Sequence, residues 1–376
     1  MSDTSRILID TATKLFEEHV TPARQLAAEA GEWPEAAWRA AEEMGLPLAL
    51  VAEEAGGFGL PMEEALDLIR LAGSFAVPLP LAETMLANRL LADAGLPCPG
   101  GPLTLAPVRV QDRPTLERRG GDGPDGGWFL RGEAHRISWG RRAGVVVLAT
   151  EAGAPDGTAP DGTAPNGTAP NGPTFVAFVP AGQAVLAAEG ANLAKEPRDS
   201  LRFDLPLRDD QVAPAAGIDA EKLRRLGAAL RSMAIAGALE RVLTMTVAYA
   251  NERSQFGRPI GKFQAIQQNL AVMAGQAAAA RAAGDIAVDA VVRGGDPLLV
   301  ATAKIRSGEA AGIVAGIAHQ VHGAMGFTHE HSLHLFTKRL WSWRDEFGGE
   351  AEWSRRLGQA VARQGTDGLW PLVTAL

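Results

Sequence analysis

The sequence predicts an α+β protein with three parts: a helical N-terminal domain, a small central antiparallel β-barrel or sandwich, and a C-terminal bundle of the four-helix type. Three observations support this order. Apolar residues recur at helical spacing in the first third, short apolar runs separated by turn residues follow, and long Ala- and Leu-rich segments fill the remainder. We therefore expect domains at residues 1–100, 101–215 and 216–376.

The composition restricts the class of protein. The chain has 376 residues, of which 46% are hydrophobic, and a net charge of −8, so it can bury a large core but lacks the basic surface that nucleic acid requires. Cys98 is the only cysteine, which excludes an intramolecular disulfide and a metal site built on several thiolates. The N-terminus does not read as a signal peptide, and no apolar run reaches the ~18–20 residues of a membrane span. We expect a cytoplasmic protein that does not bind nucleic acid and has no membrane span.

Helical spacing and helix-start signals divide the first third into segments. Pro34 stands at the first turn of the second segment, where proline is favoured. A Gly-Gly-Phe-Gly stretch ends the apolar run at residues 48–61, and we predict a plain turn there because no βαβ pattern follows it. The predicted helical segments are residues 4–30, 33–44, 61–75 and 81–94.

Short apolar runs between Gly- and Pro-rich turns begin near residue 101 and predict the strands of the central domain. The predicted strands are residues 103–110, 128–137, 145–150, 174–179 and 201–205. Between the third and fourth lies a low-complexity insertion, residues 153–173, in which APDGT or APNGT repeats. Such a composition cannot bury a core, so we predict a solvated insertion between two strands.

From Gly217 the chain reads as helical again, with leucines three and four residues apart. Residues 263–292 and 297–325 are small and apolar on more than one face, which predicts a bundle whose helices also pack against other subunits. The last segments, residues 332–347 and 351–364, mix aromatic residues with arginines.

The stretch NERSQFGRPIGKFQAIQQ, residues 251–268, separates two of these long segments. Glycines and a proline interrupt the helix there, but the polar residues exceed what a turn needs. The planar cation of Arg253 suits a phosphate. Glutamine side chains donate and accept at once, which suits a nucleotide, and three are present: Gln255, Gln264 and Gln267. A polar loop of a helix hairpin is the alternative.

This stretch resembles a signature of the acyl-CoA dehydrogenase family, flavoproteins that oxidise the α,β bond of acyl-CoA thioesters. In that family the matching turn binds the pyrophosphate of FAD, often across a subunit interface. The PLPLAET segment and the apolar-acid-acid-x-Gly-Gly-x-Gly-Leu phrase of the first third are also similar to the family. The order helical, β, helical is the family's architecture, so the resemblance covers nearly the whole chain and implies a homodimer or homotetramer.

The resemblance assigns FAD contacts to two phrases of the C-terminal domain. A Gln-x-x-Gly-x-x-Gly-Phe phrase follows the turn, and its glycines would let the backbone approach the adenosine diphosphate part. Read by itself, this phrase is more typical of a glycine-capped helix end. The implied cofactor residues are Arg253, Gln255, Phe256 and Gln264 of the turn, and Gln320, Gly323, Gly326 and Phe327 of the second phrase.

A third phrase in the central domain departs from the family pattern. The family places an aromatic-Ile-Thr-Asn-Gly segment against the flavin ring, and here the segment reads Arg136-Ile-Ser-Trp-Gly140. Ser138 can supply the hydroxyl donor, whereas Arg136 and Trp139 replace the aromatic residue and the asparagine. A Thr-Glu-Pro-x-Ala-Gly-Ser-Asp phrase that contacts flavin and substrate is represented only by Leu105-Ala-Pro-Val-Arg109, which weakens the expected contacts on that side.

Removal of the α-proton requires a carboxylate near the substrate. The family places a glutamate at one of two positions, which by residue count fall on Phe347 and Ala228. Glu346 is the nearest candidate base, although a shift of one residue turns a helical side chain by ~100°; Asp345 and Glu350 are weaker candidates. The alternative is that this segment is a solvated helix end.

Two aromatic clusters of the C-terminal domain have structural alternatives. His329, His331 and His334 lie within six residues, but no carboxylate or cysteine completes a metal site, so we expect a surface or interface cluster and no metal. Trp341 and Trp343 would stack on an adenine or pack against another subunit, and packing is the commoner role in a bundle.

The resemblance implies FAD-dependent oxidation of an acyl-CoA, with the hydride passing to flavin N5 and the electrons to an electron-transfer flavoprotein. The missing glutamate leaves an alternative: a non-catalytic subunit of a heteromer whose second dehydrogenase chain is complete. A flavin oxidase or monooxygenase of the same fold with a non-CoA substrate is a third possibility.

Overall fold

The computed structural model describes residues 2–119, 127–152, 173–215, 217–292, 294 and 296–374. The chain forms two compact units. The first, which we call the helical unit, comprises Met1–Trp33, Met62–Pro78 and Arg225–Leu376, and the second, the β unit, comprises Pro34–Pro61 and Leu79–Arg224. The predicted boundaries of the three domains stay a prediction. The predicted insertion at residues 153–173 lies outside the described residues, except for Pro173.

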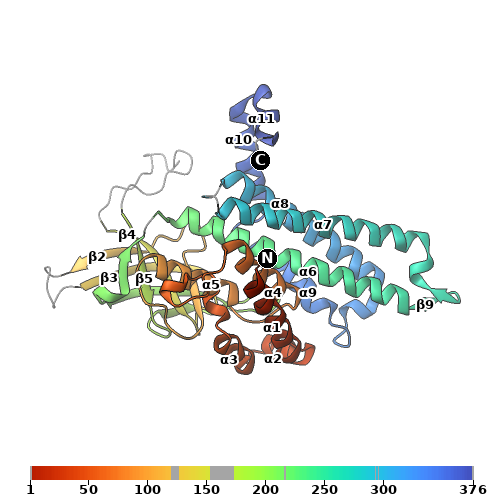
Figure 1. Ribbon diagram of the computed structural model, residues 1–376, viewed down its shortest axis with the longest axis horizontal. Helices are drawn as coiled ribbons and strands as arrows, with labels where there is room; N and C mark the ends of the chain where they lie inside the picture. The colour runs from red at the N-terminus through yellow and green to blue at the C-terminus, as the bar shows by residue number, and fades with distance from the viewer. Residues whose placement is uncertain are drawn as a thin grey trace. The chain divides into compact units, whose positions relative to one another are not determined.

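The β unit contains one sheet with the strand order β6-β7-β3-β2-β4-β5-β8 and with β1 paired to β4 (Figure 1). The strands are β1 (Leu103–Ala106), β2 (Thr115–Arg119), β3 (Gly127–Ser138), β4 (Gly144–Glu151), β5 (Thr174–Val179), β6 (Val185–Ala188), β7 (Arg198–Leu207) and β8 (Val212–Pro214). Both β1 and β2 pair with β4 in parallel. The predicted order of a helical part, a central β part and a helical part is confirmed; in detail, the sheet is mixed rather than wholly antiparallel and, over the described strands, does not close into a barrel.

The five predicted strands are present, because their β-branched and aromatic residues fill one buried layer. This layer includes Leu130, Val147 and Phe203, each 0–1% exposed. Helix α5 (Leu81–Asp93) is fixed to the sheet by Thr84, whose hydroxyl donates to the carbonyl of Leu103 and accepts from its N–H. Helix α3 (Glu35–Glu43) and the short helices η1 (Leu46–Leu48), η2 (Glu53–Ala55) and η3 (Asp209–Gln211) complete the unit.

The helical unit is built on three long helices that lie side by side in Figure 1. These are α6 (Ala220–Glu252), which begins in the β unit, α7 (Gln264–Val292) and α8 (Pro297–His322). The other helices are α1 (Asp3–His19), α2 (Pro22–Glu29), α4 (Met62–Ser74), η4 (Ile260–Lys262), η5 (Gly323–Phe327), α9 (Leu333–Trp343), α10 (Glu350–Gln364), η6 (Thr366–Gly368) and α11 (Leu369–Thr374). The helical segment predicted for residues 4–30 is in fact two helices, because Thr21 caps a new helix and Pro22 occupies its first turn.

Glycines allow α4 and α6 to touch along their backbones. A Cβ added to Gly237 of α6 would lie 1.9 Å from the carbonyl oxygen of Arg70 on α4. A Cβ added to Gly73 of α4 would lie 2.1 Å from the carbonyl oxygen of Ala234. No side chain fits at either position, so the small residues seen in the sequence set the distance between these two helices.

Helix α6 is long and apolar enough, by length and composition alone, to cross a membrane. No such run was expected from the sequence. However, 56% of its most apolar window is buried inside the fold, and buried core helices commonly show this composition.

Candidate cofactor and active site

A two-stranded hairpin joins α6 to α7 at the stretch that the sequence singled out. Strand β9 (Ser254–Gln255) pairs in an antiparallel manner with β10 (Arg258–Pro259). The two turn residues, Phe256 and Gly257, have φ angles of 52° and 78°. Two positive φ values in a two-residue loop are the signature of a type I′ turn, which Gly257 accepts readily and Phe256 does not.

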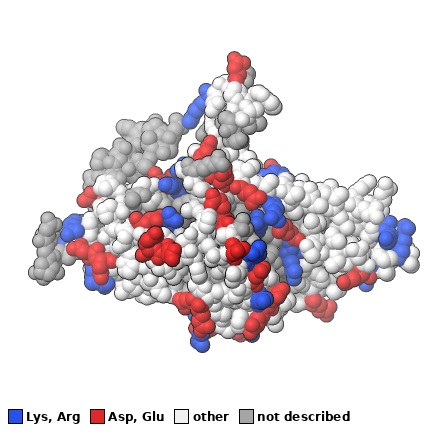
Figure 2. Space-filling view, in the orientation of Figure 1, with Lys and Arg blue, Asp and Glu red and all other residues white. Residues whose placement is uncertain are grey.

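The predicted pyrophosphate-binding side chains of this hairpin project outward. Arg253, Gln255 and Gln264 are exposed, and Phe256 is 92% exposed. Lys and Arg side chains gather at the β9 end of the unit in Figure 2, where Arg253 itself is exposed. A bulky aromatic residue that is both exposed and held at positive φ is costly, which points to a role outside the packing of this chain.

The second predicted phrase forms the end of α8 and the turn η5. Gln320 is exposed on the last turn of α8. Gly323 has φ 59° and ψ −143°, a conformation that is essentially restricted to glycine, and nothing lies within 4 Å of where its Cβ would be. Gly326 is buried, and a Cβ there would lie 3.1 Å from His319 Nδ1. The turn therefore presents bare backbone around Gly323, as an approaching phosphate requires.

The ring of His319 packs against the turn η5. His319 stacks on Phe327, with ring centroids 4.1 Å apart, and on Trp341 at 5.5 Å, while its Nε2 lies 2.9 Å from the Thr337 hydroxyl. Burial lowers the pKa of His319 below its ordinary value. Of the predicted cluster, His331 packs towards His322, and His334 contacts the ring of His329 and the carbonyl of His331. Among the described residues, no group of three or more His, Cys, Asp or Glu is arranged to hold a metal.

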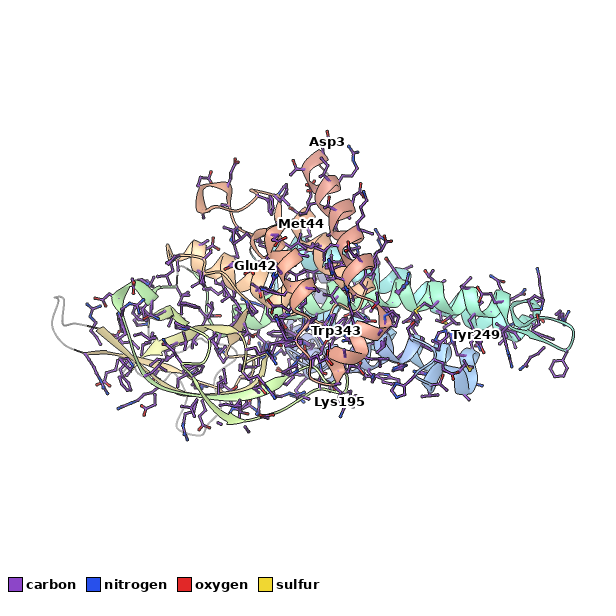
Figure 3. The ribbon with its side chains drawn as sticks, turned by 90° about the horizontal axis from the view of Figure 1, so that it is seen from below. Asp3, Glu42, Met44, Lys195, Tyr249 and Trp343 are labelled. Carbon is purple, nitrogen blue, oxygen red and sulfur yellow. The ribbon has the colours of Figure 1, made fainter. Side chains whose placement is uncertain are left out.

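Tyr249 is a site residue that the sequence analysis missed. It lies on α6 one turn before Arg253 (Figure 3), and its ring stacks on His322 at 4.3 Å. The hydroxyl of Tyr249 donates to the carbonyl of His322 at 3.3 Å. It is the only tyrosine of the chain, which is the signal that could have drawn attention to it.

The two positions at which the family places its base are both apolar. Ala228 on α6 is fully buried, and Phe347 is 8% exposed. A Cβ added to Gly227 would lie 2.3 Å from the Phe347 ring, so the two segments pack directly against each other. Over these residues the structure brings the two positions together without a carboxylate at either.

Glu346, the predicted base, lies in a buried ion pair. Its Oε2 is 2.6 Å from Nε of Arg231, and the two side chains are 9% and 6% exposed. Glu350 is paired with Arg344 at 3.0 Å, and Asp345 is exposed. The role of Glu346 as base stays a prediction, and its observed partner is a cation.

A buried lysine completes this charged group. Lys304 on α8 is fully buried, and its ammonium donates to the carbonyl of Arg344. Burial lowers the pKa of Lys304 to about 8, although Glu350 and Glu346 act in the opposite direction. Acidic and basic side chains therefore lie close together where α6, α8 and the segment after α9 meet.

In the β unit, the predicted flavin-ring segment forms the end of β3. Ser138 is 6% exposed and Trp139 is 6% exposed, whereas Arg136 projects outward at a β-bulge with φ 59°. The loop that replaces the Thr-Glu-Pro phrase is attached to β3 through Asp112, whose carboxylate accepts from the N–H of His135 and contacts its Nδ1, both at 2.8 Å. The sequence analysis missed this contact.

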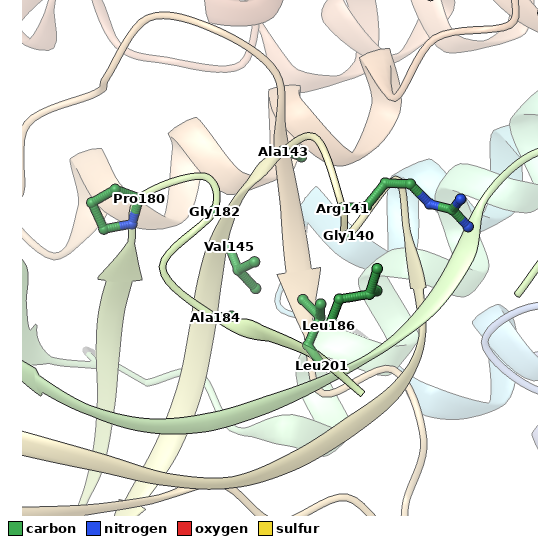
Figure 4. A pocket seen from close by; sticks show the side chains of 9 residues that line it. All are labelled: Gly140, Arg141, Ala143, Val145, Pro180, Gly182, Ala184, Leu186 and Leu201. Atoms are coloured by element: carbon green, nitrogen blue, oxygen red, sulfur yellow. The ribbon is translucent and has the colours of Figure 1, made fainter. Parts of the chain in front are cut away.

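A small hollow lies beside the same segment (Figure 4). Its volume is about 290 Å³, and Val145, Leu186 and Leu201 supply its apolar side chains. Arg141 at its rim is paired with the fully buried Asp199 at 2.6 Å. The positive charge of Arg141 is therefore already balanced by a carboxylate of this chain.

The chain is similar to known proteins over nearly its whole length. The family model for the N-terminal domain of acyl-CoA dehydrogenases matches residues 2–96, and the model for the C-terminal domain matches residues 223–358. The chain is 27% identical to acyl-CoA dehydrogenase IpdE2 of Mycolicibacterium smegmatis, covering 96% of this chain and 100% of that protein. It is 29% identical to IpdE2 of Mycobacterium tuberculosis, covering 95% and 96%.

Solved structures agree with the family models. A chain of the ChsE4-ChsE5 complex from Mycobacterium tuberculosis has the same fold, with a TM-score of 0.79, 24% identity and coverage of 96% of this chain and 98% of that one. The two family models together match more than half of the chain, and they define a flavoprotein oxidoreductase. The chain belongs to the acyl-CoA dehydrogenase family.

Proposed function

We propose that the protein takes part in the FAD-dependent oxidation of the α,β bond of an acyl-CoA thioester. The observation that supports this most is the pair of turns in the helical unit, one with an exposed Arg253 and one with bare backbone at Gly323. A permanent cation is a strong donor to a pyrophosphate, and a glycine without a side chain lets the phosphate approach the backbone closely. When bound, FAD would supply the hydride acceptor at its N5.

The residues fit this cofactor. Arg253 would pair with the pyrophosphate, and Gln255 and Gln320 would hydrogen-bond the nucleotide part. Buried polar atoms of His319 and His322 have no hydrogen-bond partner within the described chain, which is expected near a site completed by a ligand or a second subunit. In the β unit, Ser138 would donate to the ring. Electrons would then leave to an electron-transfer flavoprotein.

A second candidate function is favoured by the base positions. Ala228 and Phe347 are apolar, and Glu346 already neutralises Arg231. We infer that, if Glu346 has only this structural role, the chain works in a heteromer in which another dehydrogenase chain supplies the carboxylate. The fold also occurs in the ChsE4-ChsE5 complex. In the first candidate function the assembly would be a homodimer or homotetramer.

Anaerobic addition of acyl-CoAs of different chain length to the FAD-loaded protein separates these functions. If acyl-CoA bleaches the flavin absorbance of this chain alone, the result supports a complete acyl-CoA dehydrogenase. Bleaching only after addition of a second family chain that carries the glutamate supports the heteromer. Persistent colour in both cases, together with oxygen consumption on a non-CoA substrate, would contradict both.

A further inference from the structure

Tyr249 and His322 connect the two turns that would hold the cofactor. The N–H of Arg253 donates to the carbonyl of Tyr249 at 2.8 Å, so Tyr249 forms the last helical turn beneath the arginine. Its hydroxyl and its ring both contact His322, which immediately precedes Gly323. The two turns are therefore joined through one ring stack and one hydrogen bond.

The state of His322 in this contact is defined by its hydrogen bonds. It is 3% exposed, and its Nδ1 lies 2.8 Å from the carbonyl oxygen of Ala318, an arrangement in which Nδ1 carries the proton. Its Nε2 is buried without a hydrogen-bond partner in the described chain. A neutral ring fits this environment, and a second proton on Nε2 would have no acceptor.

We propose that Tyr249 and His322 are positioning residues that fix the turn at Arg253 relative to the turn at Gly323 for cofactor binding. Protonation of His322 would loosen this arrangement. This inference rests on the proposed function. It adds a pH-dependent hold on the cofactor, built from side chains that would not themselves touch the reacting atoms.

Burial and the neighbouring imidazoles disfavour the protonated form of His322, whereas its hydrogen bond to the Ala318 carbonyl favours that form. Tyr249 faces it from α6, His319 acts on it along α8, and His331 faces it from the loop before α9 at a ring distance of 4.6 Å. His331 and His319 are both affected in turn by His334, which the charges of Lys338 and Glu29 influence. Among the described residues, the charged groups that act directly on His322 are the imidazoles of His331 and His319.

Acidification is expected to weaken cofactor binding. Burial, followed by His331 and His319, lowers the pKa of His322 below its ordinary value of 6.5. Above about pH 6.5 the ring is neutral in both the open and the closed arrangement, and the closed arrangement loses stability progressively as the pH falls below 6.5 towards the lowered pKa. Cofactor affinity should therefore fall on acidification rather than rise.

The test is titration of the apoprotein with FAD between pH 7.5 and 5.5, monitored by flavin fluorescence. We expect the wild-type affinity to fall about tenfold or more over this range. Tyr249→Phe keeps the stack and removes one hydrogen bond, so its affinity at pH 7.5 should fall about 3- to 10-fold with the pH dependence retained. His322→Gln should flatten the pH profile, which a merely structural role would not do.

His329→Gln is the matched control, because His329 is exposed and lies outside the stack on Tyr249. It should behave as the wild type. A His322→Gln profile that parallels the wild type, or unchanged affinity in Tyr249→Phe, overturns the inference alone. Absence of FAD binding by the wild type at every pH overturns the proposed function and this inference together. His322→Asn provides a second neutral variant if His322→Gln does not fold.

Discussion

Arg231→Met should lower the free energy of unfolding by about 3–5 kcal/mol, because it removes the guanidinium that pairs with the buried Glu346 carboxylate. Arg231 and Glu346 are 6% and 9% exposed, and their charged atoms are 2.6 Å apart. Removal of one partner from such a pair costs far more than the pair itself contributes. Glu346→Gln should destabilise the fold in the same way, and chemical denaturation monitored by tryptophan fluorescence measures both.

An exposed ion pair between α6 and α7 is the control. Glu240 of α6 pairs with Arg281 at 2.9 Å, and their side chains are 37% and 51% exposed. Glu240→Gln should therefore change stability by less than about 1 kcal/mol. Combining Arg231→Met with Glu346→Gln should cost less than the sum of the single changes, since the two residues interact.

The same variants decide the role of Glu346. If Glu346→Gln abolished flavin reduction by acyl-CoA while stability stayed intact, Glu346 would be the base and the heteromer would lose its support. If stability fell and flavin reduction remained in the folded fraction, the carboxylate would be structural. The geometry favours the second outcome, because Oε2 already accepts from Arg231.

Gly237→Ala should destabilise the protein by about 3 kcal/mol or more, since overpacking against a rigid backbone cannot be relieved by a rotamer change. The added methyl would lie 1.9 Å from the carbonyl oxygen of Arg70 and 2.9 Å from the backbone nitrogen of Ser74. Helices α4 and α6 would have to separate along their whole contact. The melting temperature measured by circular dichroism reports this change.

Gly316→Ala is the matched control for this prediction. Gly316 also lies within a helix, α8, but nothing is within 4 Å of its added Cβ. Alanine is the better helix former, so this variant should gain roughly 0.5–1 kcal/mol. Equal stability of the two variants would show that α4 and α6 do not meet as closely as the structure indicates.

The order of helices and strands could be read from the sequence because each long element has a clear period. Helices α6, α7 and α8 and strands β3 to β5 were all expected close to their observed bounds. Strands β2, β6 and β8 were missed for physical reasons. Strand β6 is exposed at all four residues and β8 has only three residues, so neither shows an apolar alternation.

The parallel pairing of β1 and β2 with β4 could not be predicted, because strand periodicity carries no information about partners. The same limit applies to the site. Arg253 and Gln320 stand in short local phrases that can be recognised in the sequence. Tyr249 and His322 are 73 residues apart, and only the packing of α6 against the end of α8 reveals their contact.

Counting residues from the family's motifs placed the expected base at Phe347 and Ala228. Counting could not show that the Phe347 ring fills the space beside Gly227. Nor could it show that Arg231, one turn after Gly227, is directed to Glu346. Long-range ion pairs of this kind leave no periodic trace in a sequence.

The central claim is that the hairpin after α6 and the turn after α8 bind the FAD pyrophosphate. The most direct measurement is FAD uptake by the purified protein and by Arg253→Met, with Arg241→Met, a change at an exposed arginine of α6, as control. We predict saturable binding by the wild type and by Arg241→Met, and roughly 30-fold or greater loss of affinity in Arg253→Met. Colourless protein that takes up no FAD, or equal affinity in all three, would contradict the claim.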